Sequence, residues 1–293
     1  APAIPFGLQP IMIGADKDTY GMDLDQLEEV CKTEKPDAVI FVQVLGVPHY
    51  KERLLALKEK YGFILLEDAC AALGASYSDG KMVGTVGDMS SFSFYFGHQL
   101  STIEGGMVNT DDQELYEMLL MLRSHGWAKD LSKESYDSKM KQYDIDDFHS
   151  PFAFFVPGFN LRSTDLQAFI GLRAIDKLDD YCDKRRDNFK TYCNLLNINE
   201  LNLSERDDDF VSSFAIPVVH KCRNEIVKDL QENGIEVRPL IAGDMSTKPM
   251  IDFKVEILEN CAQLNNFGFY IPNHQGLNLS DIELICNIIN KYS

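Results

Sequence analysis

Two apolar runs joined by one helical segment constrain the fold of this chain more than any other feature. The runs are residues 38–44 and 63–66, and each is apolar on both faces of an extended strand. Strands of that kind are typical of parallel sheets, which are covered by helices. The segment between them starts near Pro48 and ends at Gly62, as helices commonly do. Strand alternating with helix predicts an α/β fold with a parallel sheet.

Polar residues follow two of the predicted strands at their carboxyl ends. Asp68 comes just after the run at 63–66, and His98 lies on a loop after a second apolar strand at residues 89–96. Ligands of open α/β sheets bind at this edge. Each residue also has a simpler interpretation, since an aspartate there can cap a helix and a loop histidine can be solvated. The sequence makes both residues candidates for a binding site.

Composition excludes several classes of function. The 293 residues suffice for one large domain or two smaller ones, and the net charge of −18 argues against nucleic acid as a general partner. No apolar run is long enough to span a bilayer, so we expect no membrane association. The seven cysteines lack metal-binding spacings, which favours free thiols in a reducing cytoplasm and no metal site.

Three blocks of sequence, in the expected order, resemble the DegT/DnrJ/EryC1/StrS family of vitamin B6-dependent sugar aminotransferases and dehydratases. The blocks are residues 66–75 with 84–88, residues 91–94 with His98 and 104–106, and residues 157–162 with 165–168 and 170–171. The resemblance implies an aspartate-aminotransferase-type fold that binds pyridoxal or pyridoxamine 5'-phosphate. It places a large cofactor-binding domain with a linking helix over residues 1–200, and a small C-terminal domain over 201–293. A polar, largely acidic stretch at 204–209 lies near that boundary.

Family members have a substantial segment before the point that corresponds to Ala1. That segment includes a small-residue loop and a helix N-terminus, which hold the cofactor phosphate. The resemblance therefore implies that this chain is a fragment whose large domain is truncated at its N-terminus.

The resemblance also gives three residues a role in cofactor binding. Asp68 is expected to pair with the pyridinium nitrogen, which keeps the ring an electron sink. Ser93 is expected to contact the cofactor phosphate, although a strand hydroxyl can equally bond nearby backbone. Asn160 matches an asparagine that reaches the cofactor of the partner subunit, which implies a homodimer. Alternatively, Asn160 only holds a turn after Gly158.

One departure from the family pattern points to the reaction. The family's aminotransferases carry a lysine where this chain has His98, and that lysine holds the cofactor covalently. Imidazole cannot form that bond, and the branch with histidine resembles 3-dehydratases of nucleotide-linked 4-keto-6-deoxyhexoses. In that reaction His98 would move a proton while the C3 hydroxyl leaves, giving a 3,6-dideoxy 4-ketosugar. The branch resupplies the cofactor amine from glutamate.

Other residues leave alternatives open. Arg123, Arg162 and Arg238 are candidates for substrate phosphates or a donor carboxylate, because guanidinium binds such groups in bidentate fashion. Ala71 and Ile103 stand where the family usually has a polar residue and a glycine. A nucleotide-sugar aminotransferase that uses another base is therefore an alternative function. An inactive fragment or binding module is another.

The remaining segments give coarser predictions. Residues 10–13 are a strand candidate, Thr110 and Gln113 suggest a capping box, and the polar stretch 128–150 is expected to be a long loop. Thr164 and Gln167 suggest a second cap that opens a long helical region. In the C-terminal part we expect strands at 213–219, 235–238 and 269–271, and helices at 222–233, 251–262 and from 280 onward.

Overall fold

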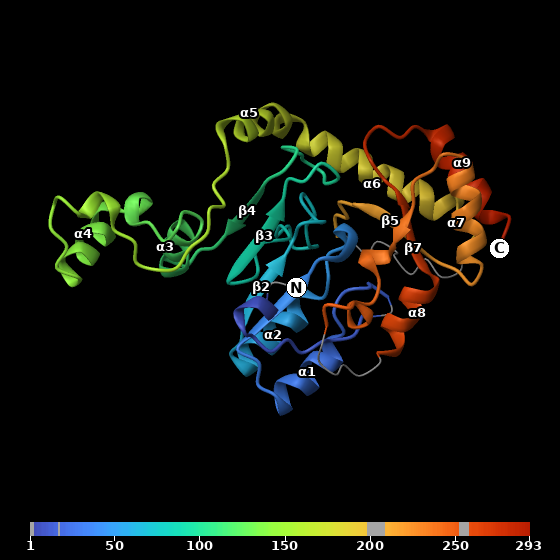
Figure 1. Cartoon of the computed structure of the whole chain (residues 1–293). Coiled ribbons are helices and arrows are strands. Elements are labelled where there is room, and N and C mark those ends of the chain that lie inside the picture. The colour runs from blue at the N-terminus through green and yellow to red at the C-terminus, as the bar shows by residue number, and fades with distance from the viewer. Residues whose placement is uncertain (1–2, 17, 198–208, 252–257) are drawn as a thin grey trace.

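A four-stranded sheet forms the first half of the fold. The structure is a computed structural model that describes residues 3–16, 18–197, 209–251 and 258–293. The strand order is β1-β2-β3-β4, with β1, β2 and β3 parallel and β4 antiparallel to β3. The predicted α/β fold is therefore confirmed (Figure 1). The strands are β1 (Ala38–Val42), β2 (Ile64–Asp68), β3 (Met89–Ser93) and β4 (Gly106–Asn109).

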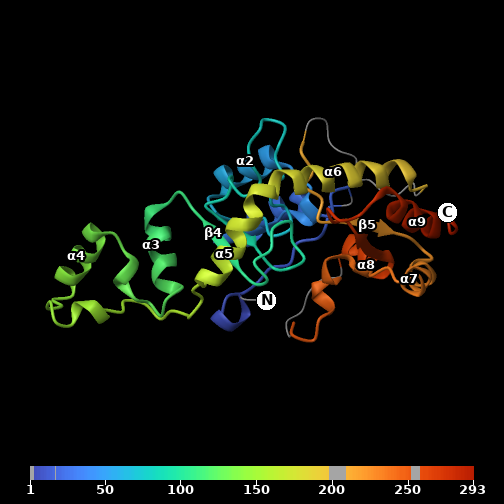
Figure 2. The same ribbon diagram turned by 90° about the horizontal axis from the view of Figure 1, so that it is seen from above.

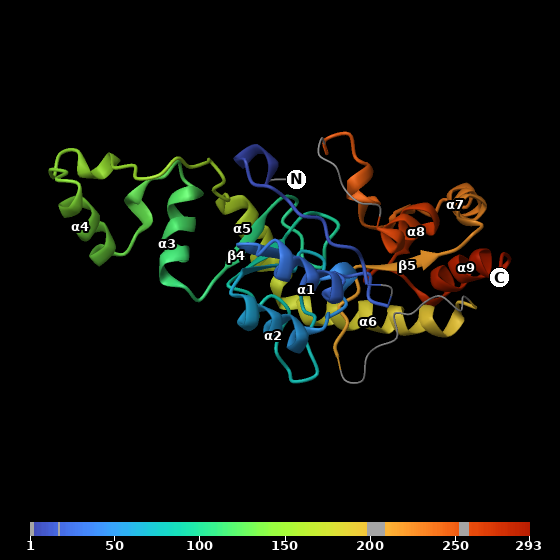
Figure 3. The same ribbon diagram turned by 90° about the horizontal axis from the view of Figure 1, so that it is seen from below.

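Two helices cover one face of this sheet. They are α1 (Leu24–Thr33) and α2 (Lys51–Tyr61), which lie side by side in Figure 3. Val39, Phe41 and Leu65 point to this face and are fully or almost fully buried under the apolar sides of the two helices. Burial of this apolar surface is the main force that holds β1 and β2 against the helices.

The opposite face of the sheet is open among the described residues. Ile40, Val42, Ile64 and Val108 lie on it and are exposed. Asp68 lies on the same face, because strand residues alternate and Asp68 pairs in register with Val42 on one side and Ser91 on the other. The carboxyl ends of β2 and β3 thus present polar groups beside apolar ones.

The segment after β4 forms an arm instead of the predicted long loop. It carries α3 (Gln113–Leu122) and α4 (Lys133–Gln142), and in Figures 1 and 2 it projects away from the C-terminal part of the chain. Ser132 caps α4 by accepting a hydrogen bond from the Ser135 N–H. Met140 is the only buried residue of α4, so the helix has no apolar stripe that a sequence pattern could reveal.

A long helix connects the arm to the C-terminal part. Thr164 and Gln167 form the predicted capping box of α5 (Asp165–Ala174), which leads into α6 (Leu178–Leu195). Figure 2 shows α6 running from the middle of the molecule to the C-terminal sheet. The predicted domain boundary, between residues 200 and 201, lies outside the described residues.

The C-terminal part is a small antiparallel sheet covered by helices. Its strand order is β5-β7-β6, and the core beneath it includes the fully buried Ile216, Phe269 and Ile271. This agrees with the predicted order of strands and helices, although β6 is shorter and later than expected and residues 252–257 lie outside the described part. The elements are β5 (Ala215–Val219), α7 (Arg223–Glu232), β6 (Arg238–Pro239), α8 (Glu259–Phe267), β7 (Gly268–Pro272) and α9 (Leu279–Asn290).

Two local predictions were wrong. Residues 10–13 form no strand, although they are described. Thr110 does not cap α3: its hydroxyl donates to the Asp88 carbonyl, and Asp112 caps the helix by accepting from the Leu115 N–H at 2.9 Å. Asp112 directly precedes the first helical residue and is therefore the N-cap, whereas Thr110 lies two residues earlier.

Gly46 allows a close approach between the two halves of the chain. Its φ is +82°, and a Cβ there would overlap the Ser212 carbonyl. We expect Gly46→Ala to lower the free energy of unfolding by about 3 kcal/mol or more, because the backbone of Ser212 cannot move aside cheaply. Urea denaturation would measure the change.

Gly62 is the matched control for this prediction. It has a similar φ of +76° at the end of α2, but a Cβ there would meet no atom within 4 Å. Gly62→Ala should therefore lower the free energy of unfolding only by the backbone strain, about 1 kcal/mol. Equal losses in the two variants would contradict the close approach at Gly46.

Candidate active site

The Asp68 carboxylate lies at the carboxyl end of β2, on the open face of the sheet. It is the last residue of the strand, and its Oδ1 accepts a hydrogen bond from the Cys70 N–H at 3.1 Å. Residues 69–75 form turns and no helix, so the helix-cap interpretation of Asp68 is wrong. The carboxylate lies on the open face of the sheet, where a ligand can reach it.

His98 lies on the loop between β3 and β4. A turn positions it, since the His98 N–H donates to the Tyr95 carbonyl at 3.0 Å. The imidazole packs between the rings of Tyr95 and Phe214, with centroids 6.1 Å and 5.2 Å away. Its Nδ1 is buried and has no hydrogen-bond partner within the described part of the chain. His98 is therefore half-buried and not a solvated loop residue.

The surroundings of His98 favour its neutral form. Burial lowers the pKa of the imidazole below its ordinary value, the positive charge of Arg185 lowers this pKa further, and the negative charge of Asp68 opposes both effects. A neutral imidazole at neutral pH can accept a proton.

Gln99, the residue after His98, anchors the histidine loop to two other segments of the chain. Its side chain is almost fully buried, and Nε2 donates to the Ala71 carbonyl and to the Ser212 carbonyl, each at 2.9 Å. These bonds connect the loop to the turn after Asp68 and to the chain that enters β5. The three segments thus meet at the candidate site.

Ser93 makes the local contact that its simpler interpretation predicts. Its Oγ accepts a hydrogen bond from the Tyr95 N–H at 3.2 Å. It lies two residues beyond Ser91 on β3, so it faces the same open side of the sheet as Asp68. The hydroxyl can still donate its own proton to a ligand.

Asn160 and Arg162 lie together, but no described contact joins them to His98 or Asp68. Both are exposed, and Asn160 Oδ1 accepts from Nε and Nη2 of Arg162 at 3.3 Å each. They follow the arm, where Asn160 pairs with Ser124 in an isolated bridge. The structure thus places this pair at the surface and apart from the histidine loop.

The other two arginines are already paired within their own segments. Arg123 forms an ion pair with Asp130 at 2.9 Å at the base of the arm. Arg238 on β6 pairs with Glu236 at 2.7 Å, and this carboxylate raises the pKa of the guanidinium. The structure does not bring either of them into contact with His98.

Sequence reasoning missed Arg185, which donates a hydrogen bond to the backbone of Phe214, the residue whose ring packs against the imidazole. A signal was present, because Cys182, Phe189 and Tyr192 recur at helical spacing on α6 and are buried. Arg185 occupies the same stripe and is buried with them. A charged residue within an apolar helical stripe is a candidate for a functional role, because charged side chains are rarely buried.

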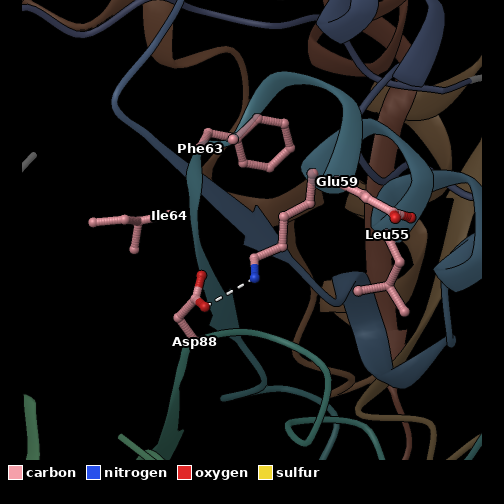
Figure 4. A pocket seen from close by; sticks show the side chains of 7 residues that line it. Leu55, Glu59, Phe63, Ile64 and Asp88 are labelled. Atoms are coloured by element: carbon pink, nitrogen blue, oxygen red, sulfur yellow. Dashed lines mark hydrogen bonds and ion pairs between the residues drawn. The ribbon is translucent and has the colours of Figure 1, made fainter.

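A surface hollow lies at the opposite end of β2 from Asp68 (Figure 4). Ile64, the first residue of β2, lines it, and an ion pair of 2.9 Å between Lys58 and Asp88 crosses it. Its other lining residues are Leu55, Glu59, Gly62 and Phe63. The hollow therefore does not belong to the candidate active site.

Three expected absences concern the described residues alone. Within these residues, no cluster of histidine, cysteine, aspartate or glutamate could hold a metal ion. Each of the seven cysteines is a free thiol. No helix in this part of the chain combines the length and apolar character needed to cross a membrane.

Comparison with known proteins identifies the family. The model of the DegT/DnrJ/EryC1/StrS aminotransferase family matches residues 1–290. A GDP-4-keto-6-deoxy-D-mannose 3-dehydratase of Yersinia pseudotuberculosis is 33% identical over 301 aligned positions, which cover 99% of this chain and 75% of the relative.

Solved structures give the same result. A crystal structure of a GDP-4-keto-6-deoxymannose-3-dehydratase mutant with bound GDP-perosamine has a TM-score of 0.86 at 28% identity, covering 98% of this chain and 76% of that one. An E. coli GDP-4-keto-6-deoxy-D-mannose-3-dehydratase with bound hydrated PLP has a TM-score of 0.85 at 27% identity, with the same coverage. The expected aminotransferase-type PLP fold is thus confirmed, and the chain belongs to the DegT/DnrJ/EryC1/StrS aminotransferase family.

Proposed function

We propose that this chain is a pyridoxamine-phosphate-dependent 3-dehydratase that converts a nucleotide-linked 4-keto-6-deoxyhexose into a 3,6-dideoxy 4-ketosugar. The observation that carries the proposal is His98, which stands at the position of the family's cofactor-binding lysine. Its imidazole is half-buried, near Asp68 and held neutral by its surroundings. Relatives named as GDP-4-keto-6-deoxymannose 3-dehydratases support the same reaction.

The residues around His98 fit the cofactor. The buried, unpartnered Nδ1 of His98 shows that this imidazole is not committed to a structural hydrogen bond. Asp68 offers a carboxylate for the pyridinium nitrogen on the open sheet face, and Ser93 offers a hydroxyl for the phosphate on the same face. What pyridoxamine phosphate supplies when bound is an amine for the sugar ketone and a ring that accepts electrons.

Within this proposal His98 carries a proton in both directions. Because Nδ1 is buried, Nε2 is the nitrogen that can reach the reacting atoms. Nε2 would take the proton that the reacting carbon gives up, and the resulting imidazolium would give it to the C3 hydroxyl, which leaves as water. Asp68 would pair with the pyridinium nitrogen and hold the cofactor ring protonated. The packing of His98 against Phe214 excludes water from one side of the imidazole.

The proposed partners are a nucleotide-sugar and glutamate, with Arg162 as the strongest of the three arginine candidates. Arg123 and Arg238 are each paired with a carboxylate, whereas Arg162 bonds only the neutral amide of Asn160 in the described contacts. A guanidinium without a charged partner retains more binding energy for a phosphate or a carboxylate.

The family's aminotransferases motivate the second candidate function, and one assay separates the two. We would incubate the chain with GDP-4-keto-6-deoxymannose, pyridoxal phosphate and glutamate, and follow the sugar by mass spectrometry. A dehydratase releases water from C3 and returns a ketone, whereas an aminotransferase leaves an amine on the sugar. The amine product would refute the proposal, and an unchanged sugar without retained cofactor would favour an inactive binding module.

The proposed role of Asn160 requires a shared site in a homodimer. If Asn160 serves the partner's cofactor, His98→Asn and Asn160→Ala should each be inactive alone. Mixing equal amounts of the two variants under subunit exchange should restore about a quarter of the wild-type activity, since half of the dimers are mixed and half of the sites in each mixed dimer are intact. No recovery from dimers that demonstrably exchange subunits would contradict a shared site.

A further inference from the structure

Arg185 on α6 is buried without an acidic partner in the described residues. Its exposed fraction is 3%, and its Nη1 donates to the carbonyls of Phe214 at 3.2 Å and Asn273 at 2.5 Å. Its Nε is buried and has no hydrogen-bond partner. Burial lowers the pKa of Arg185 to about 10, so the guanidinium is still charged at neutral pH. A buried charge without a counter-ion raises the free energy of the folded state, which favours a functional role for Arg185.

The backbone that Arg185 holds is in contact with the histidine loop at two points. The Phe214 ring packs against the His98 imidazole at 5.2 Å, and the Ser212 carbonyl accepts from Gln99 at 2.9 Å. The Phe214 N–H also donates to the Leu45 carbonyl at 3.0 Å. Arg185 therefore stabilises the surface on which the imidazole rests.

We propose that Arg185 is a positioning residue for His98: its guanidinium anchors the backbone of Phe214, against which the imidazole packs, and brings a positive charge into this cluster, so that a proton taken up by His98 is readily released again. This inference rests on the proposed dehydratase function, because it assigns Arg185 a part in the proton transfer of that reaction.

The groups that act on the imidazole come from several elements. Asp68 on β2 favours its protonated form, and Arg185 on α6 disfavours it. Tyr95 contacts the ring from the same loop. Cys182 and His274 lie close enough to Arg185 to share its field. Asp68 alone would strengthen the hold of His98 on its proton. Burial of the ring opposes this carboxylate most, and the charge of Arg185 adds to that opposition.

A weakly held proton suits the second half of the reaction. A base that binds its proton too tightly is a poor acid, and the C3 hydroxyl needs a proton when it leaves. An imidazolium destabilised by a nearby positive charge is a stronger acid than an ordinary one. The same charge therefore weakens the first transfer slightly and assists the second.

The test combines a titration with a rate measurement on three variants. The C2–H signal of His98, assigned by its loss in His98→Asn, would be followed by NMR from pH 4.5 to 9, a range of about two units on either side of the ordinary value. The variants are Arg185→Gln, which removes the charge, and Arg185→Lys, which keeps it. Arg186→Gln is the matched control, because Arg186 is the next residue of α6 and covers Phe210 instead.

We expect Arg185→Gln to raise the pKa of His98 by about one unit and to move the acid limb of kcat/KM to higher pH by the same amount. Arg185→Lys should restore the wild-type pKa, and Arg186→Gln should leave it unchanged. A His98 pKa that stays at the wild-type value in a folded Arg185→Gln protein would reduce Arg185 to a structural residue and overturn the proposal.

The wild-type protein provides a measurement that does not depend on how the variants fold. Its His98 should titrate below the ordinary value of about 6.5. A value at or above this would overturn the proposal. The titration also separates the two levels of inference: if the wild-type chain lacks dehydratase activity but the charge-dependent shift is present, the proposed function fails and the effect of Arg185 on His98 stands.

Discussion

Replacing His98 by lysine should abolish dehydration and cause pyridoxal phosphate to become covalently attached. We expect kcat to fall by about 10³-fold or more, because the variant loses its proton carrier and the new amine captures the cofactor aldehyde. Borohydride reduction followed by peptide mass mapping would locate the adduct at position 98. The wild-type protein should give no adduct at this position, since imidazole cannot form the bond.

His98→Asn is the control for this variant. Asparagine is close to histidine in polarity but can neither carry the proton nor attach the cofactor. It should lose activity to a similar extent without forming an adduct. Full activity in either variant would show that His98 is not the required base. A reduced adduct on another active-site lysine of the wild-type protein would show that the covalent anchor has moved and not disappeared.

Replacing Asp68 by asparagine should have an effect of similar size through a different cause. The neutral amide cannot keep the cofactor ring protonated, so we expect kcat to fall by about 10²- to 10³-fold. The His98 pKa should fall as well, because Asp68 raises it in the wild-type protein. Stopped-flow kinetics and the NMR titration described above would measure the two effects separately.

The hydrogen bonds of the Asp68 side chain allow a check on the folding of this variant. Among the described contacts its carboxylate accepts hydrogen bonds only from the N–H and the thiol of Cys70, and an asparagine oxygen can accept the same bonds. The melting temperature should therefore change little. A folded Asp68→Asn protein with wild-type activity would remove Asp68 from the proposed site.

Much of the fold could be predicted from the sequence because strand and helix patterns alternate clearly in its first hundred residues. Both ends of the strand predicted at 63–66 lie within two residues of the ends of β2, and α2 ends at Gly62 as predicted. The same pattern located Asp68 and His98 at or beyond the carboxyl ends of two predicted strands. Their roles rest on the family resemblance and remain predictions.

The missed features have physical reasons. Helix α4 buries one side chain, so its sequence lacks the apolar repeat on which such predictions depend. The role of Arg185 depends on contacts with Phe214 and Asn273, which are 29 and 88 residues away in the chain. No local pattern reports contacts of that kind. The short distance between Gly46 and Ser212 is equally invisible before the chain is folded.

The segment from Ser212 to Phe214 has a mechanical consequence. It enters β5 of the C-terminal sheet, yet Gln99 and the close approach at Gly46 hold it against the loops of the four-stranded sheet, and Arg185 ties it to α6. A rotation of the C-terminal sheet about α6 would therefore pull on the surface that supports the imidazole. Strand β5 is thus mechanically coupled to His98 through the ring of Phe214.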